Sequence, residues 1–246
     1  MRYTALVMKA AMRANFRSPA VAAVIAGVAL MCAAGLAVLF GTLFIRPEVA
    51  RAAPDRSVLE NHVGLVMFAT SFVCIGIYAS VFTFQSLTRE KDRGCIQALL
   101  ATPVAPRDVW LGKSLGVFLP GLAFAVVTTL AAFLGVSYTY LIPDIGFIIT
   151  PWMIITSFVA VPLVYLAMTL VVHLVGLTGR PATGNVIAQV FLPVMMSLMI
   201  NLAVRKVPSA ASWVFTVALL GVAAAAGIIV LLLRSKLTAE RITLSR

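Results

Sequence analysis

The chain has 246 residues, of which 62% are hydrophobic and only 11% are charged, and its mean hydropathy is +1.06. This composition excludes a soluble globular domain. The 19 basic and 8 acidic residues give a formal net charge of +11. Apolar runs of about 18 residues or more are long enough to cross the hydrocarbon layer of a bilayer as helices. We therefore expect an all-α integral membrane protein with a single transmembrane domain over residues 1–246.

The first segment, residues 1–18, has the periodicity of an amphipathic helix. At 100° per residue the apolar and the basic side chains fall on two neighbouring arcs. The apolar arc contains Met1, Ala5, Met8, Met12 and Phe16, and the basic arc contains Arg2, Lys9, Arg13 and Arg17. This pattern is typical of a helix in the membrane interface. A simple basic flank of the first span is the alternative.

Six apolar runs follow, and their length predicts helices, because spanning strands are shorter and alternate in polarity. The expected spans are residues 21–45, 63–84, 114–136, 147–174, 186–204 and 213–233. The first run exceeds the apolar region of a signal peptide, which has about 7 to 15 residues. We therefore expect it to remain in the mature protein.

Lys and Arg are distributed unevenly between the two sides of this six-span arrangement. With the N-terminus inside, 14 of the 19 basic residues fall on the cytoplasmic side, and the other 5 are Arg46, Arg51, Arg56, Arg205 and Lys206. Because cytoplasmic loops keep excess positive charge, both termini are expected in the cytoplasm of a multi-pass protein of the inner (plasma) membrane. The basic residues are dispersed, which favours membrane lipids over nucleic acid as their partners.

The loop over residues 86–107, between the second and third expected spans, is followed by a Gly-Lys-Ser triplet. A phosphate-binding loop requires an earlier glycine where this chain has Arg107, and it lies between a strand and a helix. Here Gly112, Lys113 and Ser114 open a membrane helix. We expect no ATP hydrolysis by this chain itself, and neither catalytic residues nor a metal site.

The same loop predicts a short amphipathic helix. Ile96, Leu99 and Leu100 have i, i+3, i+4 spacing, and Pro103 and Pro106 end any helix there. A helix that exposes apolar residues outside the membrane is expected to dock on a partner. The alternative is a solvated connector that carries positive charge.

These residues resemble the membrane subunits of ABC-2 type transporters. The resemblance lies in Glu90, Arg93, Gly94, Leu99, Leu100, Thr102, Pro103, Val104, Gly112 and Lys113. It implies a coupling helix in the loop, seated in a groove of a separate ATP-binding subunit that holds ATP and Mg. The implied docking residues are Glu90, Arg93, Gly94, Ile96, Gln97, Leu99, Leu100, Thr102 and Pro103. The chain has Cys95 and Gln97 where the family more often has Thr and Glu.

The expected spans have no ionisable side chain at mid-membrane depth, which favours an external ATPase over proton or sodium coupling. In the fifth span Gln189, Ser197 and Asn201 lie on a polar stripe that lines a passage or serves helix packing. An uncharged passage suggests an apolar or amphipathic cargo, and the resemblance, together with the lack of an evident outer docking surface for a binding protein, implies export. Because no internal repeat supplies a second half, we expect a homodimer or a close heterodimer.

Two other classes remain as alternatives. One is a secondary carrier or channel, which the uncharged spans disfavour. The other is a membrane-embedded enzyme, which is disfavoured because His62 stands apart from any nucleophile and no HExxH or GxSxG motif occurs. His173, at a span end, is expected to be a packing residue.

Overall fold

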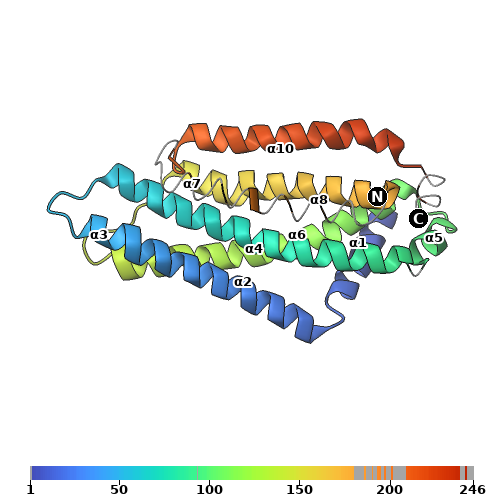
Figure 1. Cartoon of the computed structure of the whole chain (residues 1–246), viewed down its shortest axis with the longest axis horizontal. Helices are drawn as coiled ribbons and strands as arrows, with labels where there is room; N and C mark the ends of the chain where they lie inside the picture. The colour runs from blue at the N-terminus through green and yellow to red at the C-terminus, as the bar shows by residue number, and fades with distance from the viewer. Residues whose placement is uncertain are drawn as a thin grey trace.

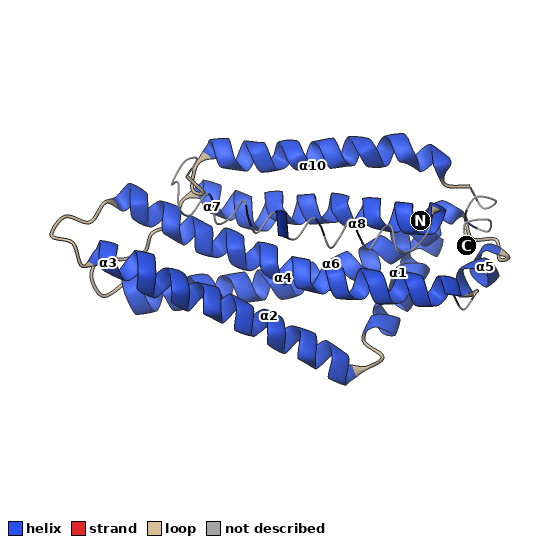
Figure 2. Ribbon diagram, in the orientation of Figure 1, coloured by secondary structure: helices blue, strands red, loops and turns tan. Residues whose placement is uncertain are grey.

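The structure is a computed structural model that describes residues 2–92, 94–179 and 209–238, together with single residues 186, 190, 193, 194, 197, 201 and 242. Its regular elements in this part of the chain are all helices, arranged as an elongated bundle (Figures 1 and 2). The elements are α1 (Arg2–Asn15), α2 (Pro19–Phe40), η1 (Gly41–Ile45), α3 (Arg46–Val49), α4 (Arg56–Asp92), α5 (Cys95–Leu100), α6 (Pro106–Val136), η2 (Ser137–Leu141), α7 (Pro151–Ile155), η3 (Thr156–Ala160), α8 (Val161–Thr178), α10 (Trp213–Leu233) and η4 (Arg234–Lys236).

Five helical stretches are long and apolar enough to cross a membrane. They are Pro19–Val49, Arg56–Phe82, Pro106–Leu141, Pro151–Thr178 and Trp213–Leu233. The chain is therefore a multi-pass membrane protein. The expected fifth span, residues 186–204, falls largely outside the described residues, so the count of six spans stays a prediction.

Two helices are longer than the apolar runs that predicted them. The second run ends at residue 84, but α4 continues to Asp92, because Gln, Arg, Glu and Lys are good helix formers without being apolar. Its 37 residues give a length of about 55 Å, more than the hydrocarbon layer requires. The third helix begins at Pro106 instead of residue 114, since proline is favoured in the first helical turn. The loop expected over residues 86–107 is correspondingly shorter.

The helix of the fourth span begins later than expected. Residues 146–150 are not helical, and Gly146 has a φ of 94°, a left-handed conformation that favours glycine. The helix starts at Pro151 after Thr150, which is extended. The expected start at residue 147 is therefore corrected, because apolar character alone does not locate the helix start.

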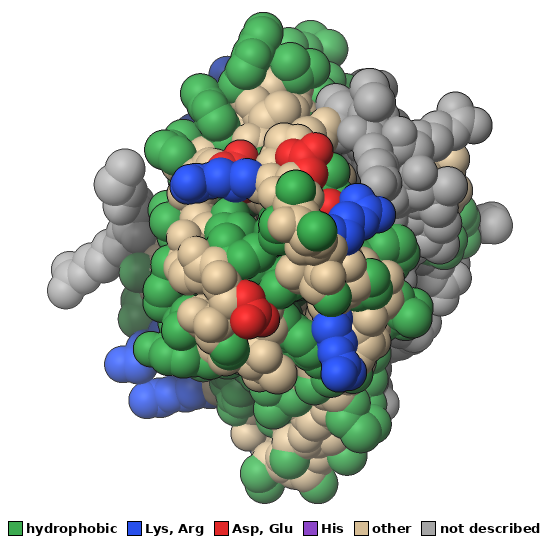
Figure 3. Space-filling model, turned by 90° about the vertical axis from the view of Figure 1, so that its left-hand side faces the viewer, with side chains coloured by type: hydrophobic (Ala, Val, Ile, Leu, Met, Phe, Trp, Pro, Cys, Tyr) green, Lys and Arg blue, Asp and Glu red, His purple; other side chains and the backbone are tan. Residues whose placement is uncertain are grey.

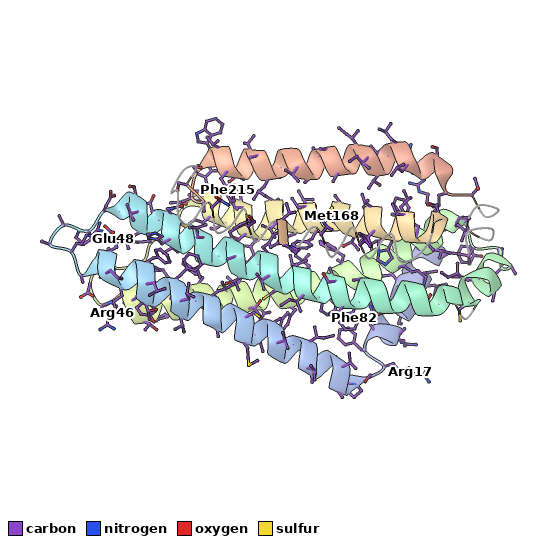
Figure 4. All side chains as sticks on the ribbon, viewed as in Figure 1. Arg17, Arg46, Glu48, Phe82, Met168 and Phe215 are labelled. Carbon is purple, nitrogen blue, oxygen red and sulfur yellow. The ribbon has the colours of Figure 1, made fainter. Side chains whose placement is uncertain are left out.

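The core is centred on α4, which packs against α2, α6 and α8. Phe68 of α4 meets Phe215 of α10 edge to face at 5.0 Å between ring centroids, and Phe72 lies 4.8 Å from the ring of Tyr165 of α8. Phe215 points from α10 toward the bundle interior (Figure 4). These aromatic contacts hold α8 and α10 on one side of α4.

A proline in the fourth span coincides with a π-helical turn. Pro162 has no amide hydrogen, and the preceding segment η3 is π-helical, with a bond from Val161 to the Thr156 carbonyl five residues back. In that register the missing donor leaves the Ser157 carbonyl free. Ser71 of α4 donates its hydroxyl to this carbonyl oxygen at 2.7 Å. The carbonyl that loses its helical hydrogen bond thus gains one from a neighbouring helix, as expected for a proline inside a span.

Candidate functional site

The candidate site is the segment that joins α4 to α6. α4 ends at Asp92, Gly94 adopts a left-handed φ of 69°, and α5 begins at Cys95. A left-handed glycine redirects the chain at a helix end without steric cost. α5 lies at the end of the bundle where α1 meets α6, and α3 lies at the opposite end (Figure 1). We refer to these as the α5 end and the α3 end.

Two features end α5 after six residues. The hydroxyl of Thr102 donates to the Leu99 carbonyl at 2.5 Å, and the amide of Thr102 donates to the same carbonyl at 3.2 Å. Ala105 is extended, as is usual for the residue before a proline. Pro106 then opens α6. The predicted short helix is therefore present, with the predicted stop.

One face of α5 is anchored in the chain's own core. Ile96 is only 2% exposed and packs in a cluster with Trp110, Leu174 and Leu177. Trp110 is fixed in turn by a hydrogen bond from its indole Nε1 to the Leu170 carbonyl at 3.0 Å. This corrects the expectation that Ile96 belongs to a docking face, because its spacing with Leu99 does not distinguish a partner from the protein interior.

The charges beside α5 are paired with each other. Glu90 near the end of α4 forms an ion pair with Lys113 in α6, whose side chain is 5% exposed while that of Glu90 is 31% exposed. Glu90 was expected among the docking residues. The structure instead turns the Glu90 carboxylate toward Lys113, because a buried ammonium requires a counter-charge.

The remaining predicted docking residues lie on the outer side of this anchor. Leu99 is half-buried, and Thr102 and Pro103 are exposed together with Cys95 and Ala98. Gly94 is half-buried at the turn. Arg93 and the side chains of Gln97 and Leu100 lie outside the described part of the chain, so their roles stay predictions.

The Gly-Lys-Ser triplet is a helix-packing element of α6. A Cβ atom on Gly112 would lie 2.7 Å from Val7 Cβ and 2.9 Å from the Thr4 carbonyl oxygen of α1. The hydroxyl of Ser114 donates to the carbonyl of Trp110 within the helix at 2.9 Å. Glycine is needed here because two helices approach closely. The triplet has neither the geometry nor the free amides of a phosphate-binding loop.

Gly116 continues this contact one turn further along α6. A Cβ atom there would lie 2.7 Å from Ala11 Cβ. Asn15 donates to the Gly116 carbonyl oxygen at 3.4 Å, the carbonyl that Pro120 four residues later leaves without its helical partner. Gly112 and Gly116 form a small-xxx-small pair, which is a sequence signal for close contact between helices.

α1 therefore packs on α6 through a face different from the predicted apolar arc. The contact face contains Thr4, Val7, Ala11 and Asn15, and Thr4 also donates its hydroxyl to Asp108 in the first turn of α6. Phe16 of the predicted arc is 50% exposed. The helix over residues 1–18 is present as Arg2–Asn15, and its location in the membrane interface stays a prediction.

Some polar contacts inside the bundle are made by hydroxyl groups. Thr156 and Thr216 hydrogen bond through their hydroxyls at 2.7 Å, which joins η3 to α10. Of the predicted passage residues, Ser197 and Asn201 are helical and exposed, Asn201 donating to the Ser197 carbonyl at 2.8 Å. Gln189 lies outside the described residues. Passage lining by these three residues stays a prediction.

The two histidines are both buried. His173 is inaccessible, and its Nδ1 donates to the Thr169 carbonyl at 2.9 Å, as expected for a packing residue. His62 is 2% exposed and its ring lies 5.3 Å from that of Phe44. Within the described ranges there is no group of three or more His, Cys, Asp or Glu side chains placed to hold a metal ion.

These features define a multi-pass helical membrane protein with a short amphipathic helix braced between two spans. The sequence profile of the family described as "ABC-2 family transporter protein" matches residues 49–216, more than half of the chain, and the chain belongs to this family. The match contains the whole candidate site from α4 to α8. No curated protein and no solved structure matches the chain. Family membership makes the chain a membrane subunit of a transporter.

Proposed function

We propose that this chain is the permease subunit of an ATP-driven ABC exporter and that α5 docks on a separate ATP-binding subunit. The observation that carries the proposal is the two-sided environment of α5. Ile96 fixes one side to Trp110, whereas Cys95 and Ala98 are exposed on the other. A helix held in this way moves together with α6 and α8 when a partner moves its exposed side.

The exposed side of α5 suits a protein groove. Ala98, Thr102 and Pro103 are small or lack charge, and the half-buried Leu99 supplies an apolar anchor. Central apolar anchors contribute most of the affinity in protein interfaces, and rim charges contribute little. The partner supplies the ATP and Mg site, since this chain's lysine in the Gly-Lys-Ser triplet is paired with Glu90.

The interior of the bundle supports an uncharged cargo. Three buried hydroxyl side chains at or beside η3, those of Ser71, Thr156 and Thr216, form hydrogen bonds with one another or with a carbonyl oxygen. We therefore infer an apolar or amphipathic cargo, carried outward through a passage completed by a second permease copy. In this arrangement the α5 end faces the cytoplasm, in agreement with the bias of Lys and Arg.

The decisive experiment is recovery of an ATP-binding subunit with the affinity-tagged full chain in mild detergent. Leu99→Asp places a charge at the centre of the proposed contact, and we expect recovery to fall by about tenfold or more, because truncating or charging such an anchor costs at least about 2 kcal/mol. The matched control is Ile145→Asp, the same kind of change at a residue that is 38% exposed in the turn at the α3 end.

Two outcomes contradict the proposal. The first is equal recovery of the ATP-binding subunit with Leu99→Asp and with Ile145→Asp. The second is ATP binding by the purified chain alone that Lys113→Ala abolishes. Ile96→Asp is not a docking test, because Ile96 is buried in the chain's own core and its replacement should destabilise the permease itself.

A further inference from the structure

The junction of α1 and α2 carries a hollow that the transport role does not explain. A cavity of about 120 Å³ lies between α2, α4 and α6, lined by Phe16, Ala22, Ala26, Tyr78, Pro120 and Phe124 among others. Helices with side chains are about 10–12 Å in diameter. The hollow is therefore too small for a partner helix, but its apolar lining suits part of a hydrocarbon chain.

A buried hydroxyl without a partner lies in the wall of this hollow. Tyr78 is 7% exposed, and its hydroxyl has no hydrogen-bond partner within the part of the chain that the structure describes. Its ring is held against α6 because Gly121 has no side chain, and a Cβ there would lie 2.8 Å from the ring. A hydroxyl left without a hydrogen bond costs about 1–3 kcal/mol, so this position favours a ligand with an acceptor oxygen.

Two basic residues are close in sequence to Phe16, which lines this hollow. Arg13 of α1 and Arg17 at the junction are exposed, and among the described residues neither forms an ion pair. Arg17 points away from the bundle at the start of α2 (Figure 4). Free guanidinium groups beside an apolar hollow are complementary to an amphiphile that carries a phosphate.

The positions of the α1–α2 junction, Phe82 and Tyr78 along the axis of α4 match the order of groups in one class of ligand. Phe16 contacts Phe82 at 6.4 Å between ring centroids, which sets Phe82 level with the junction. Tyr78 precedes Phe82 by one helical turn, about 6 Å along α4. In a phospholipid the ester carbonyls lie just below the headgroup and the acyl chains continue below them.

The seam between α2 and α6 continues beyond the hollow. A second cavity, of about 380 Å³, lies further along the same two helices and is lined by Ala33, Ala34, Ala37, Ala131, Gly135 and Thr139 among others. Both helices run in the same direction, so the two cavities follow one another along one seam (Figure 1). Small side chains on both walls leave room for a chain that extends toward the α3 end.

We infer that the α1–α2 junction binds an anionic glycerophospholipid. Its phosphate lies on Arg13 and Arg17, an ester carbonyl accepts the hydrogen bond of Tyr78, and an acyl chain lies along the α2–α6 seam. The site is separate from the proposed docking surface of α5. It uses the anionic leaflet that faces the α5 end in the proposed orientation.

The test is lipid retention by the full chain in mild detergent, measured by native mass spectrometry with phosphatidylglycerol or phosphatidylcholine as the probe. The wild type should retain phosphatidylglycerol preferentially. The double variant Arg13→Gln/Arg17→Gln should lose this preference by about thirtyfold, since basic side chains near an anionic headgroup contribute about 1 kcal/mol each. Arg234→Gln is the matched control, an exposed arginine at the same end of the bundle, and should keep the preference.

A second comparison isolates the hydroxyl of Tyr78. Wild type should retain ester-linked phosphatidylglycerol about fivefold better than the ether-linked analogue, which has no ester carbonyl, and Tyr78→Phe should retain both equally. Ala26→Trp, which fills the hollow, should reduce retention of both, with Ala26→Leu as a milder replacement if the larger one fails to fold. Equal retention of the two headgroups by wild type, an equal effect of Arg234→Gln, or an ester preference that survives in Tyr78→Phe would overturn the assignment. None of these measurements involves the ATP-binding subunit, so their failure leaves the proposed function untouched.

Discussion

The two ends of the bundle are held together by different kinds of polar contact. At the α5 end the contacts join residues far apart in the sequence: Lys113 with Glu90, Thr4 with Asp108, and Trp110 with the Leu170 carbonyl. These contacts link α1, α4, α6 and α8. They fix the relative positions of whole helices, so that a force applied to α5 reaches several spans.

At the α3 end the ion pairs are local. Arg51 pairs with Glu48 at 2.7 Å and Arg56 with Glu60 at 3.2 Å, each within one helical turn or one loop. Figure 3 shows acidic and basic side chains scattered over this end among hydrophobic ones. Such pairs stabilise a turn without connecting spans. The buried ion pair of the α5 end therefore connects two spans, whereas the ion pairs of the α3 end stabilise only local segments.

The largest effect is expected from breaking the buried ion pair unevenly. Glu90→Gln leaves the Lys113 ammonium buried without a counter-charge and should lower the free energy of unfolding by about 3–5 kcal/mol. Lys113→Met should cost only about 1–2 kcal/mol, because the partly exposed Glu90 carboxylate keeps water. Detergent-based reversible unfolding measures both values.

The double variant Glu90→Gln/Lys113→Met is the control for this prediction. It removes both charges and should recover most of the stability lost in Glu90→Gln. If the two single variants cost the same, or if the double variant is as unstable as Glu90→Gln, the ion pair is not the buried contact described here.

The next largest effect concerns the helix contact of α1. Gly112→Ala places a methyl group against Val7 and the backbone of Thr4, and overpacking of this kind costs about 1–3 kcal/mol. Gly135→Ala on the same helix has open space and should be neutral or stabilising by about 0.5–1 kcal/mol. Disulfide trapping between cysteines placed on α1 and α6 measures the separation. Equal behaviour of the two alanine variants would show that α1 does not pack on Gly112.

Hydrogen bonds, in contrast to ion pairs, also join distant residues near the start of α10: the hydroxyls of Thr156 and Thr216 form one such bond, and Asn61 forms another. Buried Asn61 of α4 accepts a hydrogen bond from the backbone amide of Ala210, at 2.7 Å, just before α10. Asn61→Ala leaves that amide unsatisfied and should cost about 1–2 kcal/mol, measured by the same unfolding titration. A loss larger than that of Glu90→Gln would reverse the ranking of the two ends.

The smallest effect is expected for the exposed pair of the α3 end. Arg56→Ala or Glu60→Ala should change the free energy of unfolding by no more than about 0.5 kcal/mol, since solvent screens a pair four residues apart on one helix. Raising the salt concentration should remove even this contribution. A cost above about 1 kcal/mol in low salt would indicate that the pair contributes more than a local contact.

Most of the helices could be predicted from hydropathy, because lipid requires each span to be long and apolar and to satisfy its own backbone. The extension of α4 to Asp92 could not be predicted from hydropathy, because charged helix-forming residues continue a helix without adding to its apolar character. The short helix α5 was predicted from its spacing and its prolines. The burial of Ile96 in the chain's own core was not predicted, because the spacing of Ile96 and Leu99 fits a core contact as well as a contact with a partner.

The residue pattern was sufficient to predict a helical membrane protein, to predict where its loop helix stops, and to find the transporter family that its motif resembles. These properties depend on local composition and on backbone chemistry at glycine and proline. Three contacts became known from the three-dimensional arrangement of the helices: Lys113 pairs with Glu90, α1 packs against Gly112, and Ser71 donates to the carbonyl left free by Pro162. Each of these contacts joins helices that are distant along the chain, and helix packing, not local sequence, brings their side chains together.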